Sequence, residues 1–526
     1  MNEARVRLST LLWLLCAGGA QALSLAWPGP AGPGLVPGEP LPWLQVLALA
    51  AAFHLLRQAP SALAAAGRLW LFATVWLAGT FWWLFISMHT YGGLPSPLAL
   101  AAVLALALAL GLYYAAAGAL AWRWRHQPAW RQALAWAALW TLAELARGSW
   151  FTGFPWGAIG YAHGGALAAL APWVGVYGMG AVAAALAAGL ALAVHGTGPA
   201  ARPRRPMWPW LALPLLVWPA AGPGLADAMP SFTQPAGRLQ VTLLQGNIPQ
   251  DDKFNPATGL PLALSWYHET LLAALALEAD TPGLVVAPET AVPVLPQDLD
   301  PAYWQALRNG VDAGRSALLL GVPLGDLAAG YTNSALGWAP GSAAQYRYDK
   351  HHLVPFGEFI PPGFRWFVDR MQMPLGDFSR GALGQTPLRW GGQRIAPNIC
   401  YEDLFGEELA VGFRDPAQAP TVLVNLSNIA WFGPTVAVDQ HRQISRLRAL
   451  ELQRPMLRAT NTGATALLDH RGRVVQALPP FTRATLSGVV EGRSGLTPYA
   501  RWAGAWGLWP LGLFCALLLL VLWRRP

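Results

Sequence analysis

The segment Ile395-Ala396-Pro397-Asn398-Ile399-Cys400-Tyr401-Glu402-Asp403 joins a short apolar run to polar residues and a helical pattern. We expect a buried strand that ends at Cys400 and a helix that follows it. A strand-to-helix turn exposes a side chain at the edge of a sheet and leaves backbone N–H groups available to a developing oxyanion. The residues alone support a reactive thiol and a buried packing cysteine at position 400 equally.

The composition places much of the chain in lipid. The 526 residues are 54% hydrophobic and 12% charged, whereas charged residues make up roughly 25% of an ordinary soluble domain. The formal charge of +8 belongs mainly to the apolar part, because residues 1–221 hold 11 Arg and 3 acids, while residues 222–523 hold 22 basic and 24 acidic side chains. A nucleic-acid-binding protein needs a basic patch on its soluble face, and this balance argues against one.

Eight apolar stretches are long enough to cross a bilayer, which takes roughly 17 to 25 residues. Twelve Arg lie in alternate short loops and at the two ends of the chain, and only Arg147 lies in the short loops between them. Basic side chains are retained on the cytoplasmic side, so both termini are predicted to be cytoplasmic and residues 223–500 to be exported. The stretches are 8–27, 41–58, 68–90, 97–121, 131–147, 166–195, 207–222 and 503–523.

The sequence therefore predicts a polytopic α-helical membrane protein with one exported α/β domain. We divide it into a transmembrane domain of about seven helices (1–222), a catalytic domain (223–500) and a C-terminal transmembrane helix (501–526). Within the exported domain, strands and helices are expected to alternate. The expected strands are Leu239–Ile248, Leu284–Pro288, Ala317–Val322, Ile395–Tyr401 and Thr421–Leu426, and the expected helices are Ala257–Ala279, Pro301–Ala313 and Val436–Leu452.

Cysteine usage singles out one thiol. Cys16 and Cys515 lie inside apolar runs, where a thiol usually packs as a small hydrophobe. Cys400 is the remaining cysteine, so it has no partner for a disulfide within the exported domain. No Cys-x-x-Cys or Cys/His spacing predicts a metal site, and we expect no metal and no dissociable cofactor.

Two further residue types stand out in the exported domain. Of 35 basic residues only Lys253 and Lys350 are lysines, and lysine offers a compact ammonium that guanidinium cannot replace. Glu289 follows the apolar run Gly283–Pro288, where partial desolvation favours a general base. Each residue alone has a plainer explanation: a lysine in a surface loop or a carboxylate that caps a helix. Glu289, Lys350 and Cys400 together, each next to a strand of one domain, favour catalysis.

These residues resemble a known family. The motifs Pro288-Glu289-Thr290, Lys350 to Glu358, Asn398-Ile399-Cys400-Tyr401-Glu402, Asn425-Leu426-Ser427-Asn428 and Trp431-Phe432-Gly433 are similar to the Glu-Lys-Cys pattern of the nitrilase superfamily. Joined to the apolar stretches in this order, they resemble its membrane-embedded branch, the apolipoprotein N-acyltransferases. The likeness extends to Arg380-Gly381, the Arg446–Arg454 helix and Gly495–Arg501.

The resemblance implies an α-β-β-α sandwich in which Cys400 is the nucleophile, Glu289 the general base and Lys350 the stabiliser of the tetrahedral intermediate, supported by Glu358, Tyr401 and Glu402. It also implies transfer of an acyl chain from a phospholipid, with phosphatidylethanolamine as the usual donor, through a Cys thioester to the α-amine of S-diacylglyceryl-cysteine in an apolipoprotein. The expected setting is the bacterial inner membrane, with a periplasmic catalytic domain and a monomeric enzyme.

Two positions depart from the family pattern, and several residues are expected to contact substrate. Ile429 stands where the family commonly has Asp, and Phe254 stands where an aromatic, often Trp, lies near the lipid site. The predicted substrate contacts are Phe254, Trp156, Asn333 and Trp431. An acidic residue inside the fifth apolar stretch, Glu144, is expected to reach the membrane interface with its carboxylate.

Two other functions remain open from the sequence. One is a membrane-tethered amidohydrolase of the same superfamily, in which water resolves the thioester. The other is a transporter or sensor with an exported binding domain, although the first seven apolar stretches contain few of the ionisable groups that ion-coupled transport requires. Replacement of Cys400 separates the second alternative from acyl transfer, because a transporter does not need the thiol.

Overall fold

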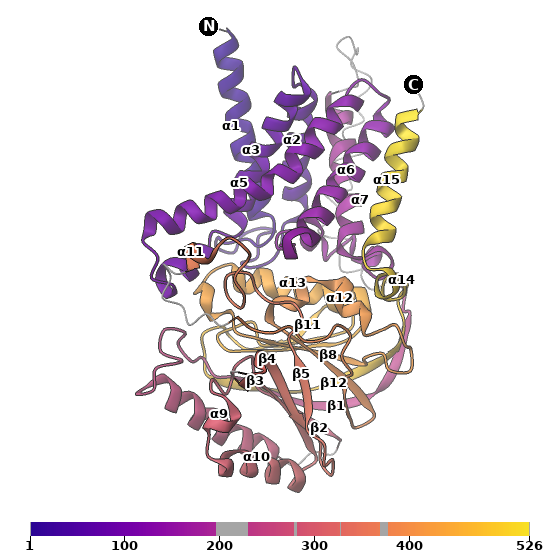
Figure 1. Ribbon diagram of the computed structural model, residues 1–526. Coiled ribbons are helices and arrows are strands. Elements are labelled where there is room, and N and C mark those ends of the chain that lie inside the picture. Colours follow the sequence, from indigo (N-terminus) through magenta and orange to yellow (C-terminus); the bar gives the residue numbers. More distant parts are fainter. Residues whose placement is uncertain (1, 196–229, 278–280, 327, 369–376, 525–526) are drawn as a thin grey trace. The chain divides into compact units, whose positions relative to one another are not determined.

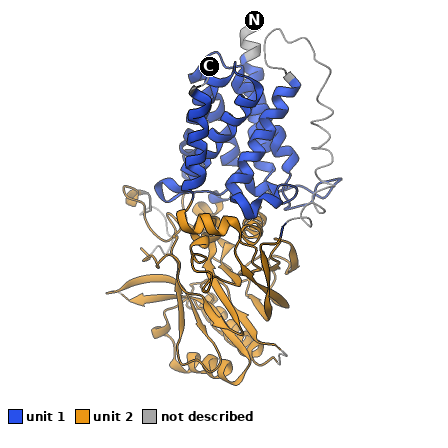
Figure 2. Cartoon of the chain, turned by 90° about the vertical axis from the view of Figure 1, so that its right-hand side faces the viewer, with its two compact units in different colours: residues 1–85, 96–230, 508–526 blue, residues 86–95, 231–507 orange. Residues whose placement is uncertain are grey.

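The computed structural model describes residues 2–195, 230–277, 281–326, 328–368 and 377–524. The chain forms two compact units, coloured separately in Figure 2. Unit 1 contains residues 1–85, 96–230 and 508–526, and unit 2 contains residues 86–95 and 231–507. The short segment 86–95 therefore packs with a unit whose other residues follow it by more than a hundred positions.

The regular elements in the described part of unit 1 are all helices (Figure 1). Three of its segments have the length and hydropathy of a membrane span: Ala62–Thr80, Ser96–Trp124 and Ala168–Val194. The contacts between helices are richest for the pairs α3 with α5, α1 with α3, and α6 with α7. The main helices are α1 (Asn2–Leu23), α2 (Pro42–Arg57), α3 (Ala62–Thr80), α5 (Ser96–Ala121), α6 (Ala129–Ser149), α7 (Ala171–His195) and α15 (Trp509–Arg524).

Two predicted apolar stretches differ from the helices that form. The stretch 68–90 was expected to be one helix, but α3 ends at Thr80 and a separate π-helical turn, Ser87–Tyr91, follows in unit 2. The last stretch, 503–523, is not one helix: α14 (Pro498–Trp506) ends in unit 2, and α15 begins at Trp509 in unit 1. Hydropathy did not detect either break, because aromatic residues keep both connections apolar. The predicted stretch 207–222 lies outside the described residues.

Glu144 does not reach an interface within unit 1, contrary to the expectation from sequence. Its side chain is fully buried, and Oε1 accepts a hydrogen bond of 2.8 Å from the backbone N–H of Ile159. The neighbouring Arg147 is also buried and donates to the carbonyl oxygens of Phe154 and Trp156. These contacts satisfy backbone groups of an irregular segment that have no partner within a regular helix and, in an apolar environment, no water to bind.

Unit 2 is built on two six-stranded sheets, ordered β12-β1-β2-β3-β4-β5 and β11-β10-β9-β8-β7-β6. Each sheet has a central parallel group, β1-β2-β3 in the first and β7-β8-β9 in the second, and antiparallel strands outside it. The first sheet contains β1 (Thr233–Gln245), β2 (Gly283–Val286), β3 (Ser316–Asp326), β4 (Gly330–Trp338), β5 (Tyr346–Asp349) and β12 (Ala484–Gly495). The second contains β6 (Leu388–Trp390), β7 (Gln393–Ile399), β8 (Val422–Ser427), β9 (Met456–Thr460), β10 (Ala466–Leu468) and β11 (Val474–Ala477).

Alternation along the strands creates three apolar layers. In β2, Leu284 and Val286 enter the core between the two sheets, whereas Val285 packs on the opposite face. In β8, Val422 and Val424 enter the same central core, and Leu423 packs on the outer face. Both faces of these strands are buried, so their sequences are largely apolar and do not alternate between apolar and polar residues.

Helices cover the two outer faces and complete an α-β-β-α sandwich (Figure 1). Helices α9 (Gly259–Leu275) and α10 (Pro301–Ala313) cover the first sheet, while α12 (Gly406–Val411), α13 (Ala437–Leu452) and α14 cover the second. The predicted architecture of this domain is confirmed. Each of the five expected strands overlaps an observed one, and the three expected helices correspond to α9, α10 and α13.

Candidate active site

The turn after β7 presents Cys400. The strand ends at Ile399, and residues Cys400–Leu404 form a 3-10 turn that leads into α12. Cys400 has φ = +53°, a left-handed conformation that a residue with a side chain seldom adopts. Asn425 Nδ2 donates to the Cys400 carbonyl oxygen at 3.1 Å. Neighbouring contacts thus hold Cys400 in a strained conformation at the end of a parallel strand, which is common at functional sites.

Glu289 follows the carboxyl end of β2 and binds groups from both sheets. Its Oε1 accepts from Asn333 Nδ2 of β4 at 2.8 Å, and its Oε2 accepts from the backbone N–H of Asn428, just after β8, at 2.8 Å. Its side chain is buried, with 7% of the residue exposed. The carboxylate is therefore fixed in orientation by donors to both of its oxygens.

Lys350 follows β5 and lies between two carboxylates. Its Nζ is 2.9 Å from Glu358 Oε1 and 3.4 Å from Glu289 Oε1. Burial lowers the pKa of Lys350, but Glu358, Glu289 and Cys400 together outweigh burial and raise that pKa above its ordinary value. Lys350 is therefore a cation beside Cys400 at neutral pH.

The thiol of Cys400 is protonated in the resting site. Burial, and then the negative charge of Glu289, raise its pKa to about 12, although the positive charge of Lys350 acts in the opposite direction. A thiol in this state needs a base at the moment of attack. Glu289 is the carboxylate with the strongest electrostatic effect on it.

Glu402 joins the turn of Cys400 to the segment of Lys350. Its Oε2 accepts from the backbone N–H of Ile399 at 2.6 Å and from the Tyr348 hydroxyl at 2.9 Å, and its Oε1 accepts from the N–H of His351 at 2.7 Å. Burial raises the pKa of Glu402 to about 7, against the effect of these hydrogen bonds. Glu402 therefore holds the Cys400 turn and the Lys350 segment at a fixed distance from each other.

A buried polar network lies next to the Cys400 turn and was not anticipated from the sequence. His441 Nε2 is 2.9 Å from Asp403 Oδ1 and 3.3 Å from the Cys400 carbonyl oxygen. Arg458 lies 3.3 Å from Asp403 Oδ2, and Ser445 donates to the same oxygen. Arg458 also donates to His441 Nδ1, so Nδ1 accepts and Nε2 carries the proton. His441 and Ser445 come from α13 and Arg458 from β9, and their sequence carries no catalytic signature.

The residues predicted to contact substrate fall into different environments. Asn333 is buried and donates to both Glu289 and Glu358. Phe254 is 44% exposed on the loop after β1. Trp431 is half-buried and meets Tyr91 edge-on, with ring centroids 5.9 Å apart. Trp156 belongs to unit 1, where it is buried against Trp83.

The other predicted positions have defined places too. Glu358 Oε2 accepts from the Val354 N–H at 2.8 Å, which closes the loop after β5. Tyr401 is buried and packs edge-on against Phe405. Ile429, expected from the sequence to depart from the family pattern, is buried at 1% exposure. Among the described residues, no group of three His, Cys, Asp or Glu is arranged to hold a metal ion.

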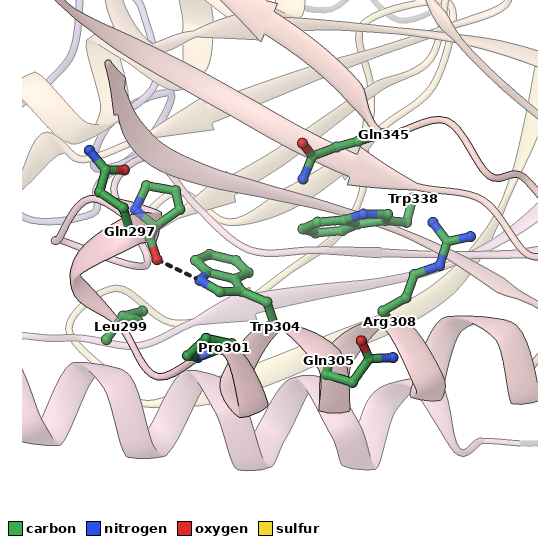
Figure 3. Close-up of a pocket in the computed structure, with 9 residues that line it drawn as sticks. Gln297, Leu299, Pro301, Trp304, Gln305, Arg308, Trp338 and Gln345 are labelled. Atoms are coloured by element: carbon green, nitrogen blue, oxygen red, sulfur yellow. Dashed lines mark hydrogen bonds between the residues drawn. The ribbon is translucent and has the colours of Figure 1, made fainter. Parts of the chain in front are cut away.

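A separate cavity of about 340 Å³ lies between α10 and the adjoining strands (Figure 3). Trp304 and Trp338 form its walls, Arg308 and several Gln side chains lie at its rim, and Trp304 donates to the Pro296 carbonyl oxygen. It contains none of the residues around Cys400 and no pair of acid and nucleophile. The cavity is therefore not part of the catalytic cluster.

Known proteins match both parts of the chain. The family model for the apolipoprotein N-acyltransferase N-terminal domain matches residues 21–189, and the carbon-nitrogen hydrolase model matches residues 240–498. A carbon-nitrogen hydrolase from Helicobacter pylori superposes with a TM-score of 0.35 and 15% identity, over 48% of this chain and 89% of its own.

Curated relatives match over nearly the full length. The apolipoprotein N-acyltransferase of Verminephrobacter eiseniae is 55% identical, covering 95% of this chain and 93% of its own. That of Ralstonia nicotianae is 48% identical, covering 88% of this chain and 86% of its own. Identity at this level over both units, together with the Glu-Lys-Cys cluster in the sandwich, places the chain in the apolipoprotein N-acyltransferase family.

Proposed function

We propose that this protein is an acyltransferase that moves a fatty acyl chain from a phospholipid to the N-terminal amine of S-diacylglyceryl-cysteine in apolipoproteins, the last step of lipoprotein maturation. The observation that carries the proposal is the shared ion pair of Lys350 with Glu289 and Glu358 beside Cys400. A base and a permanent cation at one thiol are what acyl transfer through a thioester requires.

The first half-reaction forms the acyl-enzyme. Glu289 takes the proton from the Cys400 thiol while the sulfur attacks the ester carbonyl carbon of the donor, proposed to be phosphatidylethanolamine. Lys350, with the backbone N–H groups at the start of the 3-10 turn, stabilises the oxyanion. The carbon–oxygen bond then breaks, and protonated Glu289 gives its proton to the leaving glycerol oxygen, which releases a lysophospholipid.

The second half-reaction transfers the acyl chain to nitrogen. The neutral α-amine of the acceptor attacks the thioester carbonyl, and Glu289 takes a proton from that nitrogen. The carbon–sulfur bond breaks to give an amide and the Cys400 sulfur, which recovers its proton from Glu289. The two steps need no redox partner, and every proton passes through Glu289.

The membrane supplies both substrates in this proposal. We propose eight spans, both termini in the cytoplasm and a periplasmic catalytic domain, in the inner membrane of a bacterium, supported by the Arg distribution and by the three span-like helices. The boundaries 1–222, 223–500 and 501–526 and a monomeric state remain predictions. Phe254, Trp431 and Trp156 are proposed to contact lipid, and the exposure of Phe254 favours its part most directly.

The test is the intact mass of the purified protein after incubation with phosphatidylethanolamine vesicles. The wild type is expected to gain the mass of one acyl chain, while Cys400→Ser gains none. Addition of a diacylglyceryl-cysteine peptide should remove the adduct and yield an N-acyl peptide. An adduct that disappears equally fast in buffer without peptide would favour the amidohydrolase instead, and no adduct on the wild type would contradict the thioester mechanism.

A further inference from the structure

Lys253, one of only two lysines in the chain, is buried beside Glu289. It lies on the loop after β1, its exposed fraction is 1%, and its Nζ is 3.5 Å from the Glu289 carbonyl oxygen. Its backbone N–H bonds the Pro249 carbonyl oxygen at 2.9 Å, which folds the loop back toward the site. A buried ammonium is costly unless it is matched by negative charge, so its position needs an explanation.

The charges that face Glu289 balance only if Lys253 is counted. Glu289 and Glu358 are two buried carboxylates, and Lys350 is one cation that lies closer to Glu358 than to Glu289. These three groups sum to one negative charge, and Lys253 brings the sum to zero. When the Cys400 proton moves to Glu289, the negative charge moves to sulfur and the sum stays at zero.

We propose that Lys253 is a positioning residue for acyl transfer: a second buried cation that keeps Glu289 ionised and holds the turn that carries it. The turn needs such support, because Thr290 has φ = +51° and the Glu289 carbonyl oxygen is the acceptor that Lys253 contacts. In this proposal Lys350 stabilises the oxyanion and pairs with Glu358, while Lys253 stabilises the charge and the position of Glu289. This inference rests on the proposed roles of Glu289 and Cys400.

The electrostatic environment of Lys253 is simple. Burial lowers its pKa to about 8, and Glu289 is the one charged group with a resolved opposing effect. Its chain neighbours Asp251 and Asp252 are more exposed and have no resolved effect on it. The charged or titratable groups that face Glu289 are Lys350, Lys253, Cys400 and, through Asn333, Glu358.

The test compares the pH dependence of acyl-enzyme formation in wild type, Lys253→Met and Lys253→Arg. Methionine has a similar length and no charge. Without the cation, the protonated form of Glu289 is favoured. The acid limb of the pH–rate profile is therefore expected to move to a pH about one unit higher, so that the rate at a given pH below the limb falls about tenfold. Arginine is expected to restore much of the limb position. Arg238→Gln, which removes an exposed charge from β1, controls for net charge and should leave the limb in place.

A second measurement protects the test against misfolding. Alkylation of Cys400 by iodoacetamide, assigned by peptide mass mapping apart from Cys16 and Cys515, reports on the site without any lipid. The Lys253→Met protein should show the same upward shift of its acid limb in this reaction. If the acid limbs of Lys253→Met and wild type coincide in both measurements, and the wild type still forms the acyl adduct, the proposed role of Lys253 is wrong. Loss of the wild-type adduct would instead overturn the proposed function.

Discussion

The hydroxyl of Tyr348 donates to Glu402 Oε2 at 2.9 Å, and this bond ties strand β5 of one sheet to the turn after β7 of the other. Lys350 lies two residues beyond Tyr348, and Cys400 lies two residues before Glu402. The distance between the cation and the nucleophile therefore depends on a bond between residues that do not react.

Glu402→Gln is expected to impair the site without removing a reacting atom. The carboxylate of Glu402 faces only donors, so the amide nitrogen of Gln must point at one of them and leave it unsatisfied, which costs about 1–3 kcal/mol. Thermal unfolding should show the loss, and acyl-adduct formation should fall by at least tenfold. Tyr348→Phe is the matched variant, and a smaller effect of the same kind is expected there.

Gly321→Ala is expected to displace Glu289 through the backbone. A Cβ atom on Gly321 would lie 2.5 Å from both the Pro288 carbonyl oxygen and the Thr290 nitrogen, closer than real contacts allow. Because β3 is buried, the turn of Glu289 must move, at a cost of about 1–3 kcal/mol. Acyl-adduct formation should fall at least tenfold in a protein that still folds.

Gly412→Ala provides the comparison for this glycine. Its added Cβ meets atoms only at 3.5 Å or more, and its φ is −62°. Its activity and melting temperature should remain close to wild type. Equal losses in both variants would indicate general sensitivity to the substitution rather than movement of Glu289.

Asp403→Asn is expected to destabilise the sandwich strongly. The change leaves Arg458 with no carboxylate in a buried site, and breaking a buried pair costs about 3–5 kcal/mol. Chemical denaturation of the solubilised protein measures this loss. Ser445→Ala removes one donor from the same carboxylate and should cost much less, about 1 kcal/mol. If Asp403→Asn had the same denaturation midpoint as Ser445→Ala, the ion pair of Asp403 with Arg458 would not be essential for stability.

The same network predicts how stability depends on acid. Burial alone would raise the pKa of Asp403, but His441 and Arg458 outweigh it and the pKa is lowered. A carboxylate with a lowered pKa in the folded state stabilises the protein above its unfolded pKa of about 3.9, and this contribution is lost as pH falls further. Asp403→Asn should therefore flatten the stability curve below about pH 4, as measured by melting temperature across that range.

Cys400 is expected to react as a thiol rather than as a preformed thiolate. Its raised pKa, about 12, leaves almost no thiolate at neutral pH. Above the acid limb that Glu289 sets, the rate of Cys400 alkylation should therefore show no second inflection near pH 7 and should rise again toward pH 9, and the ultraviolet absorbance of a thiolate should be absent near neutrality. A second inflection near neutrality, with thiolate absorbance, would mean that Lys350 outweighs burial and Glu289.

The sequence predicted five of the six strands in the two parallel groups, most clearly β2 and β8, which are buried along their whole length and are largely apolar. The sixth, β9, is equally buried but was missed, because its five residues include Arg458 and Thr460. Strand β5, Tyr346–Asp349, is short and polar at a sheet edge, and no local pattern distinguishes it from a loop. Strand β11, Val474–Ala477, was also missed: it is exposed along its whole length at the edge of the second sheet, so no buried apolar face marks it.

The residues of the site likewise divide into those that the sequence identifies and those that it does not. Residues with unusual chemistry for their position, such as Cys400 and Glu289, could be identified from the sequence. His441 and Arg458 could not, because a buried histidine or arginine on a helix or strand has the same local sequence as an exposed one. Their function depends on contacts between residues 38 to 55 positions away, which only the fold defines.

The segment 86–95 has a practical consequence for work on a soluble fragment. A protein cut to residues 231–507 would lose Tyr91, whose ring packs against Trp431, and Ile86, which lies beside Gly433. The cut would expose the indole of Trp431, next to the Ser427–Asn428 end of β8, and would promote self-association of the fragment. Grafting the ten residues 86–95 onto such a fragment through a flexible linker is the simplest way to restore the missing side of that surface.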